Sequence, residues 1–349
     1  MKRTQDYSIA FLGAGANGSS IAADMVHAGY EVSCYDQWPE NIEAIRQNGF
    51  IINSPVGSKN VHAKAYHLCQ LAEQPKPFFD IVFMAFKSYD TLWACELIKP
   101  YLSDDGILVG LQNGMTAGII EKSVGKNRTI GCVVELSSEM TQPGIVQRNT
   151  PKERTWFGIG SVNKENVSAI DGIRDILSCA GTVSVSENIL SAKWMKLLVN
   201  TMSLGPFALL GLPVQAGLSE VGMREIVLKI GQEAMLLGEA LGFEAEPIMG
   251  LNQEEMRQSN RLPEKLLDTL VGHIGPAARD CILQDFLKGR RTEIEMVNGF
   301  VVEESKKIGK STPYNAAVIE IAAMISSGII SPKPENIKLL HDVIKRNLG

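Results

Sequence analysis

Residues 7–28 read YSIAFLGAGANGSSIAADMVHA, and this stretch decides the fold of the first part of the chain. The apolar run from Tyr7 to Leu12 predicts a strand, and the pattern from Ser19 to Ala28 predicts a helix. Between the two lies a G-x-G-x-x-G turn made of Gly13, Ala14, Gly15, Ala16, Asn17 and Gly18. In such a turn the first glycine makes the tight bend, the second lets the backbone approach a pyrophosphate, and the third lets the helix pack against the strand. The stretch therefore predicts a dinucleotide-binding unit, with the phosphates at the helix N-terminus.

A second predicted strand, Glu31 to Tyr35, ends at an acidic residue, Asp36. This carboxylate follows Gly18 by 18 residues, which is where an acidic side chain accepts hydrogen bonds from the ribose hydroxyls of the adenosine half. A carboxylate at this position repels a 2′-phosphate, so Asp36 favours NAD over NADP. Arg46, in the following helix, is the residue that could restore NADP binding.

Composition limits the class of protein. A length of 349 residues exceeds one typical domain, so two domains are expected. The net charge of −5 provides no basic surface for a nucleic-acid partner. The six cysteines stand singly and the five histidines show no ligand spacing, which indicates reduced thiols, a cytoplasmic location and no metal site. The polar N-terminus and the lack of an apolar run of about 18 residues argue against a signal peptide and a membrane partner.

Strand and helix patterns alternate through the first half of the chain, which favours a parallel sheet covered by helices on both faces. The expected strands of this sheet are Tyr7–Leu12, Glu31–Tyr35, Ile81–Ala85, Ile107–Gly110 and Thr129–Val134. Three later runs are expected to extend the far edge of the sheet, where antiparallel pairing is one option; they are Gly144–Gln147, Thr155–Ile159 and Thr182–Val185. The segment from Asn53 to Asn60, with Pro55 and Gly57, is interpreted as a loop.

From Ile189 onward the pattern changes to long helices, expected at Ile189–Leu204, Ser219–Leu241, Pro263–Leu270, Gly299–Ile308 and Tyr314–Ser327. The predicted fold is therefore an α/β Rossmann-type dinucleotide-binding domain over residues 1–187, followed by an all-helical substrate and catalytic domain over residues 188–349. Apolar positions such as Ile226, Ile230, Met235 and Leu236 could support a homodimer, although the core of the domain is the commoner use of such a stripe.

Lys193, Lys196 and Asn200 stand at positions i, i+3 and i+7 of the first of these helices, so they share one side of it. An amine and an amide one turn apart suit a ketone reduction in which the amine protonates the developing alkoxide. Two lysines on a helix are more often solvated surface charges. The position of this helix next to the domain boundary favours the catalytic interpretation.

Three more polar residues stand where chemistry is expected. Lys87 and Asn113 directly follow two strands of the predicted sheet, and ligands bind at the carboxyl ends of such strands in open α/β folds. Glu293 follows a dense run of charges in the helical half. If Glu293 is buried beside a catalytic lysine, it would help hold that lysine charged and oriented.

The set of motifs as a whole resembles the ketopantoate reductase family, which are 6-phosphogluconate-dehydrogenase-like, NAD(P)-dependent reductases of 2-keto acids. The resemblance covers nearly the whole chain and rests on GAGANG, Met84-Ala85-Phe86-Lys87, Leu111-Gln112-Asn113-Gly114, the stretch KWMKLLVN from Lys193 to Asn200, and the stretch from Gln284-Asp285 to Thr292-Glu293-Ile294. It implies that ketopantoate is reduced to pantoate, with Lys196 as the general acid. The catalytic set is then Lys196, Glu293 and Asn200, and the substrate-binding set is Asn113, Asn200, Cys281 and Lys193. The cofactor-binding set is Gly13, Ala14, Gly15, Ala16, Asn17, Gly18, Asp36, Lys87, Asn113 and Glu293.

Three departures from the family pattern favour an alternative. Cys281 stands where the family usually has a serine, and Leu204 stands where it usually has a second asparagine, so a less polar substrate pocket is expected. Asp36 stands where an NADP-preferring member usually supplies an arginine nearby. These residues point to an NAD-preferring D-2-hydroxyacid dehydrogenase acting on a different 2-keto acid. A dinucleotide-binding sensor without catalysis is a further alternative, but such a sensor would not need Lys196, Asn200 and Glu293.

Overall fold

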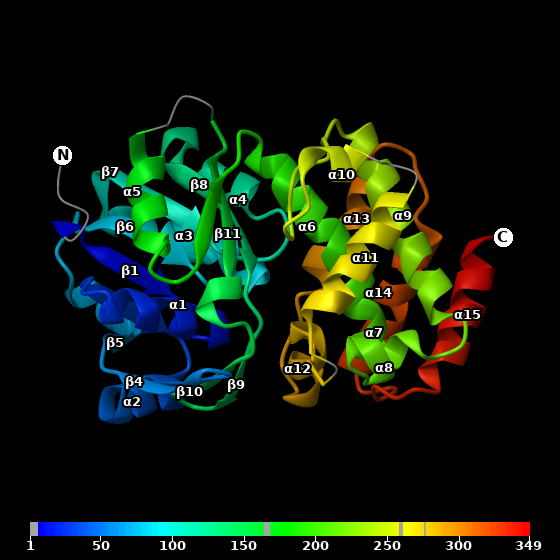
Figure 1. Ribbon diagram of the computed structural model, residues 1–349, viewed down its shortest axis with the longest axis horizontal. Coiled ribbons are helices and arrows are strands. Elements are labelled where there is room, and N and C mark those ends of the chain that lie inside the picture. The colour runs from blue at the N-terminus through cyan, green and yellow to red at the C-terminus, as the bar shows by residue number, and fades with distance from the viewer. Residues whose placement is uncertain (1–5, 164–167, 258–260, 276) are drawn as a thin grey trace. The chain divides into compact units, whose positions relative to one another are not determined.

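The computed structural model describes residues 6–163, 168–257, 261–275 and 277–349 (Figure 1). The chain divides into two compact units, Met1–Lys193 and Trp194–Gly349. The division falls within helix α6 (Ile189–Ser203), which continues from one unit into the other. The predicted domain boundary between residues 187 and 188 lies just before this shared helix, a few residues before the division of the two units. It stays a proposal.

The first unit is built on a large, mostly parallel sheet. Within the described residues it has eight strands in the order β12-β11-β8-β7-β6-β1-β2-β5. Their bounds are β1 (Ile9–Leu12), β2 (Val32–Asp36), β5 (Lys64–His67), β6 (Phe79–Met84), β7 (Leu102–Gly110), β8 (Thr129–Glu135), β11 (Trp156–Ser161) and β12 (Thr182–Val185). The strands from β5 to β8 in this order are parallel to one another, and β11 pairs antiparallel with β8. The predicted Rossmann-type sheet and its antiparallel far edge are confirmed.

Helices cover both faces of this sheet, because alternate residues of its central strands are apolar on opposite sides. One face, on which Phe11 and Phe83 stack with ring centroids 4.9 Å apart, packs against α1 (Ala16–His27), α2 (Pro39–Asn48) and α5 (Ser168–Leu177). The other face, which carries Leu12 and Met84, packs against α3 (Thr91–Ile98) and α4 (Ala117–Val124). Short 3-10 turns lie at η2 (Leu68–Glu73), η3 (Ser88–Asp90), η4 (Lys99–Tyr101), η5 (Lys126–Arg128) and η6 (Lys152–Arg154).

A small second sheet corrects two predictions. It has the order β4-β3-β10-β9 in the described part of the chain, with bounds β3 (Phe50–Ser54), β4 (Gly57–Val61), β9 (Ser138–Gln142) and β10 (Ile145–Arg148). The predicted loop Asn53–Asn60 is therefore the turn and much of the β3–β4 hairpin, and its polar, exposed β4 gave no strand periodicity. The run Gly144–Gln147 does not extend the main sheet, because β10 pairs in parallel with β3 instead.

A buried ion pair ties this small sheet to the main one. Arg148, at the end of β10, forms a salt bridge with Asp24 of α1, and both side chains are almost fully buried. The same guanidinium donates to the hydroxyl of Thr155 (2.9 Å) and to the carbonyl oxygen of Ala180 (3.0 Å). The small sheet is thus fixed against α1 by charge as well as by apolar packing.

Helices are the regular secondary structure of the second unit among its described residues. After α6 it comprises α7 (Gly205–Leu210), α8 (Val214–Leu218), α9 (Met223–Ala240), α10 (Gln253–Arg257), α11 (Leu262–His273), α12 (Cys281–Leu287), α13 (Ile294–Lys307), α14 (Pro313–Ser326) and α15 (Asn336–Asn347). The five predicted helices of this half correspond to α6, α9, α11, α13 and α14. Nowhere in the described ranges is a helix long and apolar enough to cross a membrane.

Trp194 lies at the centre of this unit. It is fully buried, stacks on Phe243 with ring centroids 4.6 Å apart, and donates from its indole nitrogen to the carbonyl oxygen of Ala234 in α9 (3.1 Å). Of the apolar stripe on α9, Ile226 and Ile230 are buried, whereas 47% of Leu236 is exposed. The stripe therefore serves mainly as core, and the homodimer stays a proposal.

Candidate functional site

The glycine turn between β1 and α1 has no room for a side chain at two positions. Gly13 has φ +111°, in the region that side chains rarely adopt, and a Cβ there would lie 2.6 Å from the backbone of Ala85. A Cβ on Gly18 would lie 2.1 Å from the carbonyl oxygen of Gly13. A Cβ on Gly15, in contrast, would meet nothing within 4 Å. The first and third glycines are therefore needed by the fold, while the second leaves open space beside the backbone.

Side chains from three elements hold the peptide groups of Ala14 in this turn. Asp36, at the end of β2, accepts from the Ala14 N–H with Oδ2 (2.5 Å) and from the Trp38 N–H with Oδ1 (2.8 Å). The carbonyl oxygen of Ala14 accepts from Asn41 Nδ2 (2.9 Å) and from Ser19 Oγ (2.7 Å). The turn is thus preorganised by buried polar contacts, and Asp36, 8% exposed, is part of that frame.

This turn fits the pyrophosphate of a dinucleotide. Helix α1 begins at Ala16 with Gly15 as its N-cap, so the first N–H groups of the helix have no acceptor within it. Those N–H groups and the positive end of the helix dipole favour an anion. The open space at Gly15 would let its phosphate oxygens approach the backbone. Asn17, in the first turn, accepts from the hydroxyl of Ser138 (2.5 Å).

The ends of β6 and β7 are joined by one buried side chain, Gln112. Its Nε2 donates to the carbonyl oxygens of Phe86 (3.0 Å) and Lys87 (3.3 Å) and to Thr91 Oγ1 (2.9 Å). The structure therefore brings together the two strand ends that carry Lys87 and Asn113, as the carboxyl-end argument predicted.

Helix α6 carries the three predicted polar residues, in very different surroundings. Lys193 is 3% exposed, and its Nζ donates to the carbonyl oxygens of Gln112 (3.0 Å) and Cys132 (3.1 Å). Burial lowers the pKa of this ammonium to about 8. Asn200 is also buried, whereas Lys196 is the one residue between 191 and 200 that is not. Lys196 alone therefore keeps an accessible amine on this stretch of helix.

In the second unit a buried amide fixes α13 against α6. Asn298 Nδ2 donates to the carbonyl oxygen of Thr201 (3.0 Å) and to Asn315 Oδ1 (2.9 Å). Asn315 in turn donates from Nδ2 to Glu233 (2.8 Å), a half-buried carboxylate whose pKa is raised mainly by desolvation. Glu293, 5% exposed, is the N-cap residue of α13, so this network sets the position of the helix that begins just after Glu293.

Cys281 is the first residue of α12. It is half-buried, and Asp280 before it caps the helix by accepting from the N–H groups of Ile282 (2.8 Å) and Leu283 (2.9 Å). Burial raises the pKa of the Asp280 carboxyl to about 7. Cys281 is thus held at a well-defined helix start.

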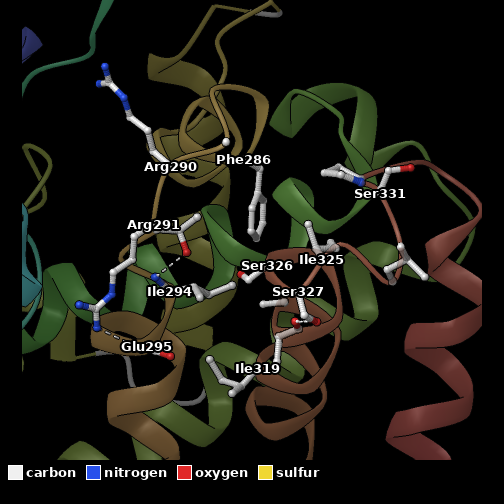
Figure 2. A pocket seen from close by; sticks show the side chains of 16 residues that line it. Phe286, Arg290, Arg291, Ile294, Glu295, Ile319, Ile325, Ser326, Ser327 and Ser331 are labelled. Atoms are coloured by element: carbon white, nitrogen blue, oxygen red, sulfur yellow. Dashed lines mark hydrogen bonds and ion pairs between the residues drawn. The ribbon is translucent and has the colours of Figure 1, made fainter.

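A pocket of about 690 Å³ lies between the end of α12, the start of α13 and the end of α14 (Figure 2). Arg291 at its rim donates to Glu295 Oε2 (3.2 Å), and Ile294 and Ile319 contribute to its apolar wall. None of the residues predicted for catalysis or ligand binding lines this pocket. In the described ranges, no group of three or more His, Cys, Asp or Glu side chains is placed to hold a metal ion.

Sequence reasoning missed the residues that organise the site without being in it. Asn41, the side chain of Gln112 and Asn298 each connect segments that are 26 to 103 residues apart. Gln112 had a signal, since it lies in the Gln112-Asn113-Gly114 motif at a strand end. Asn41 had none, because an asparagine in a polar helix resembles an exposed residue.

Comparison with known proteins gives matches over both units. The family model described as "Ketopantoate reductase PanE/ApbA" matches residues 9–161, and that described as "Ketopantoate reductase PanE/ApbA C terminal" matches residues 188–326. A 2-dehydropantoate 2-reductase from Pyrococcus abyssi is 27% identical over 319 residues, which is 88% of this chain and 94% of that protein. One from Mesorhizobium japonicum is 26% identical over 342 residues, which is 91% of this chain and 97% of that protein.

Solved structures show the same fold. A PanE/ApbA family ketopantoate reductase from Ralstonia eutropha superposes with a TM-score of 0.77 at 23% identity, covering 92% of this chain and 98% of that one. A D-mandelate dehydrogenase in complex with NADH and anilino(oxo)acetate superposes with a TM-score of 0.81 at 21% identity, with the same coverage of both chains. At such identities these structures establish the fold.

Proposed function

Because the chain belongs to the ketopantoate reductase family of NAD(P)-dependent oxidoreductases, which reduce 2-keto acids, we propose that it reduces ketopantoate to pantoate with Lys196 as the general acid. The observation that carries the residue assignment is the exposure pattern of α6. Lys196 is the only residue from 191 to 200 that is not buried, and it stands in the motif KWMKLLVN. An amine kept accessible on an otherwise buried stretch is suited to act on a ligand.

The chemistry divides between a cofactor and the side chains of this protein. The turn from Gly13 to Gly18 would hold the dinucleotide, which supplies a hydride to the keto carbon when bound in reduced form. Lys196 donates a proton from Nζ to the keto oxygen, so the product is a hydroxyl and the lysine becomes a neutral amine. Asn200 and Asn113 orient the keto acid through their amides. Glu293 holds the lysine or the substrate in place.

We propose that NAD is the preferred cofactor. Asp36 is a carboxylate at the end of β2, where it would accept from a free ribose hydroxyl and repel a 2′-phosphate. Arg46, which could offset this repulsion, is engaged elsewhere. Its guanidinium donates to the carbonyl oxygen of Ala65 (2.8 Å) and to Glu43 Oε1 (2.8 Å).

A second candidate function has its own support. Leu204 and Cys281 replace the asparagine and serine of the family pattern, so the pocket that they would line is less polar. A D-2-hydroxyacid dehydrogenase that reduces a bulkier or more apolar 2-keto acid with NADH fits these two residues and Asp36 together. Cys281 would contact the substrate in either case, whereas the Lys193 ammonium is 3% exposed and donates to two backbone carbonyl oxygens instead.

The test is a set of initial rates of NADH and NADPH oxidation with ketopantoate and with a panel of 2-keto acids that carry larger apolar side chains. Turnover of ketopantoate supports the first function. NADH-linked turnover of a different keto acid replaces it with the second. Cofactor binding without turnover of any substrate would show a sensor.

Lys196→Gln tests the general acid. It should lower kcat by a factor on the order of 10²–10⁴ while the Kd of NAD(P)H stays within about threefold of the parent. Lys310→Gln, which removes an exposed lysine of the same unit, is the matched control and should leave both values unchanged. An equal loss of turnover and cofactor binding in Lys196→Gln would reject its assignment as the acid.

We further propose that the protein is cytoplasmic, acts on a small molecule without a nucleic-acid or membrane partner, and forms a homodimer. The singly spaced thiols and the acidic net charge support the first two statements. The exposed Leu236 on α9 supports the third. A sedimentation measurement of the mass in solution tests it.

A further inference from the structure

Lys193 is the least expected residue of the predicted site, because its ammonium is buried. It is 3% exposed, and among the described residues its hydrogen bonds go to two backbone carbonyl oxygens and to no carboxylate. A buried cation without a counter-charge is unfavourable, and an apolar residue would fill the same space at less cost. The hydrogen bonds of Lys193 must therefore explain why a lysine and not an apolar residue stands at this position.

The start of α6 packs on the sheet at two glycines, and the stem of Lys193 lies beside one of them. Gly131 of β8 and Gly160 of β11 are register partners in the sheet. A Cβ on either would come within 2.8 Å of Ile189, and one on Gly131 would also lie 3.6 Å from Lys193 Cδ. The first turn of α6 thus packs directly on the backbone of the sheet, and the Lys193 stem passes beside Gly131.

The ammonium reaches the point at which β7 and β8 separate. The two strands pair through Gly110 and Gly131, and beyond that register they share no further partners. Lys193 Nζ lies beyond it, 3.0 Å from the carbonyl oxygen of Gln112 and 3.1 Å from that of Cys132. The lysine takes the place of the strand-to-strand hydrogen bonds that end there, and it joins the segment after β7 and the middle of β8 to α6.

This bond fixes the orientation of one peptide group. The Gln112–Asn113 peptide is trans, so holding its carbonyl oxygen against Lys193 turns the Asn113 N–H to the opposite side. The side chain of the same Gln112 holds the carbonyl oxygens of Phe86 and Lys87. Lys193 and the Gln112 side chain together therefore hold the backbone of both segments that carry the proposed ligand-binding residues Lys87 and Asn113.

We propose that Lys193 is a positioning residue of the reductase, whose ammonium fixes the Gln112–Asn113 peptide so that Asn113 is presented to the reacting ligands in one orientation. The expected effect on catalysis rests on the proposed function, whereas the fixing of the Gln112–Asn113 peptide is independent of it. This positioning role differs from direct substrate binding, because Lys193 donates both of its hydrogen bonds to carbonyl oxygens of the protein backbone.

The experiment combines backbone hydrogen exchange with kinetics in Lys193→Met, which keeps the length of the stem and removes the ammonium. In the cofactor-free protein we expect amide exchange in the peptide covering residues 111–116 to accelerate at least tenfold, while the exchange of α9 stays unchanged. With substrates we expect kcat to fall on the order of 10- to 100-fold, as for a misplaced reacting group, and the Kd of NAD(P)H to change less than threefold. Lys310→Met is the control and should change none of these values.

The outcomes separate this inference from the proposed function. Unchanged exchange at residues 111–116 in Lys193→Met overturns it, and so does an unchanged kcat in an active enzyme. Faster exchange in a protein whose parent turns over no keto acid keeps the peptide clamp and rejects the reductase function. A merely structural lysine would accelerate exchange in α9 as well and lower kcat and cofactor binding together. If Lys193→Met does not fold, Lys193→Gln, which keeps one amide donor on a shorter stem, is measured in the same way.

Discussion

Gly15→Ala should separate cofactor binding from stability at the glycine turn. Gly15 is the N-cap of α1 with φ −69° and ψ −172°, an extended backbone that alanine adopts without strain, and its Cβ would meet nothing within 4 Å. The loss of a glycine N-cap costs about 1 kcal/mol or less, so we expect Tm to fall by no more than about 3 °C. The new methyl group would instead occupy the space that a pyrophosphate needs.

The effect on binding follows from the hydrogen bonds that the methyl group blocks. A hydrogen bond to a charged group contributes about 1.5–3 kcal/mol, and every 1.4 kcal/mol is a tenfold change in affinity. Loss of one N–H to phosphate bond should therefore raise the Kd of NADH about 10- to 100-fold. Fluorescence titration of the purified protein with NADH measures this value, and thermal unfolding measures the stability of the same samples.

Gly18→Ala is the contrasting variant in the same turn. Its Cβ would lie 2.1 Å from the carbonyl oxygen of Gly13, so the backbone must shift, at a cost of about 1–3 kcal/mol or more. We expect Gly18→Ala to lose stability and binding together. Wild-type affinity for NADH in Gly15→Ala would refute the reasoning, because it would mean that no phosphate approaches this glycine.

Three further changes test other parts of the structure. The pKa of Asp280 is raised by burial to about 7, so the folded state holds this proton more tightly than the unfolded chain; the associated stability is present below about pH 4 and is lost as the pH rises through 7. Asp280→Asn keeps the cap and should remove this loss, so its urea midpoint should exceed that of the parent at pH 8 by more than at pH 5. Arg148→Met leaves Lys59 as the charged partner of the buried Asp24 and removes the hydrogen bonds to Thr155 and Ala180, so it should destabilise the first unit by about 1.5–3 kcal/mol, measured by urea unfolding; a change below about 0.5 kcal/mol would contradict the stabilising role of the buried ion pair. Gly238→Ala places a Cβ 2.0 Å from Trp194 Nε1, so it should shift the tryptophan fluorescence emission and lower the Tm of the second unit. A fluorescence spectrum and a Tm like those of the parent would contradict this prediction.

The sequence by itself determined the elements whose signals are local. The G-x-G-x-x-G turn between a strand and a helix, the alternation of strands and helices, and the helical second half all follow from periodicity and glycine placement within windows of about 20 residues. The order of the motifs also indicated the ketopantoate reductase family, which the matches over residues 9–161 and 188–326 confirm.

Tertiary structure alone decided which distant residues meet. The small sheet depends on the pairing of β3 with β10, about 90 residues apart, so the loop assigned to Asn53–Asn60 could not be recognised as a hairpin. Asp36 accepts a hydrogen bond from the Ala14 N–H, and Lys193 donates to the carbonyl oxygen of Gln112, 81 residues away. No local sequence pattern predicts either hydrogen bond. A polar residue in a sequence looks the same whether it faces water or a buried carbonyl, because the difference arises only when the fold removes water from around it.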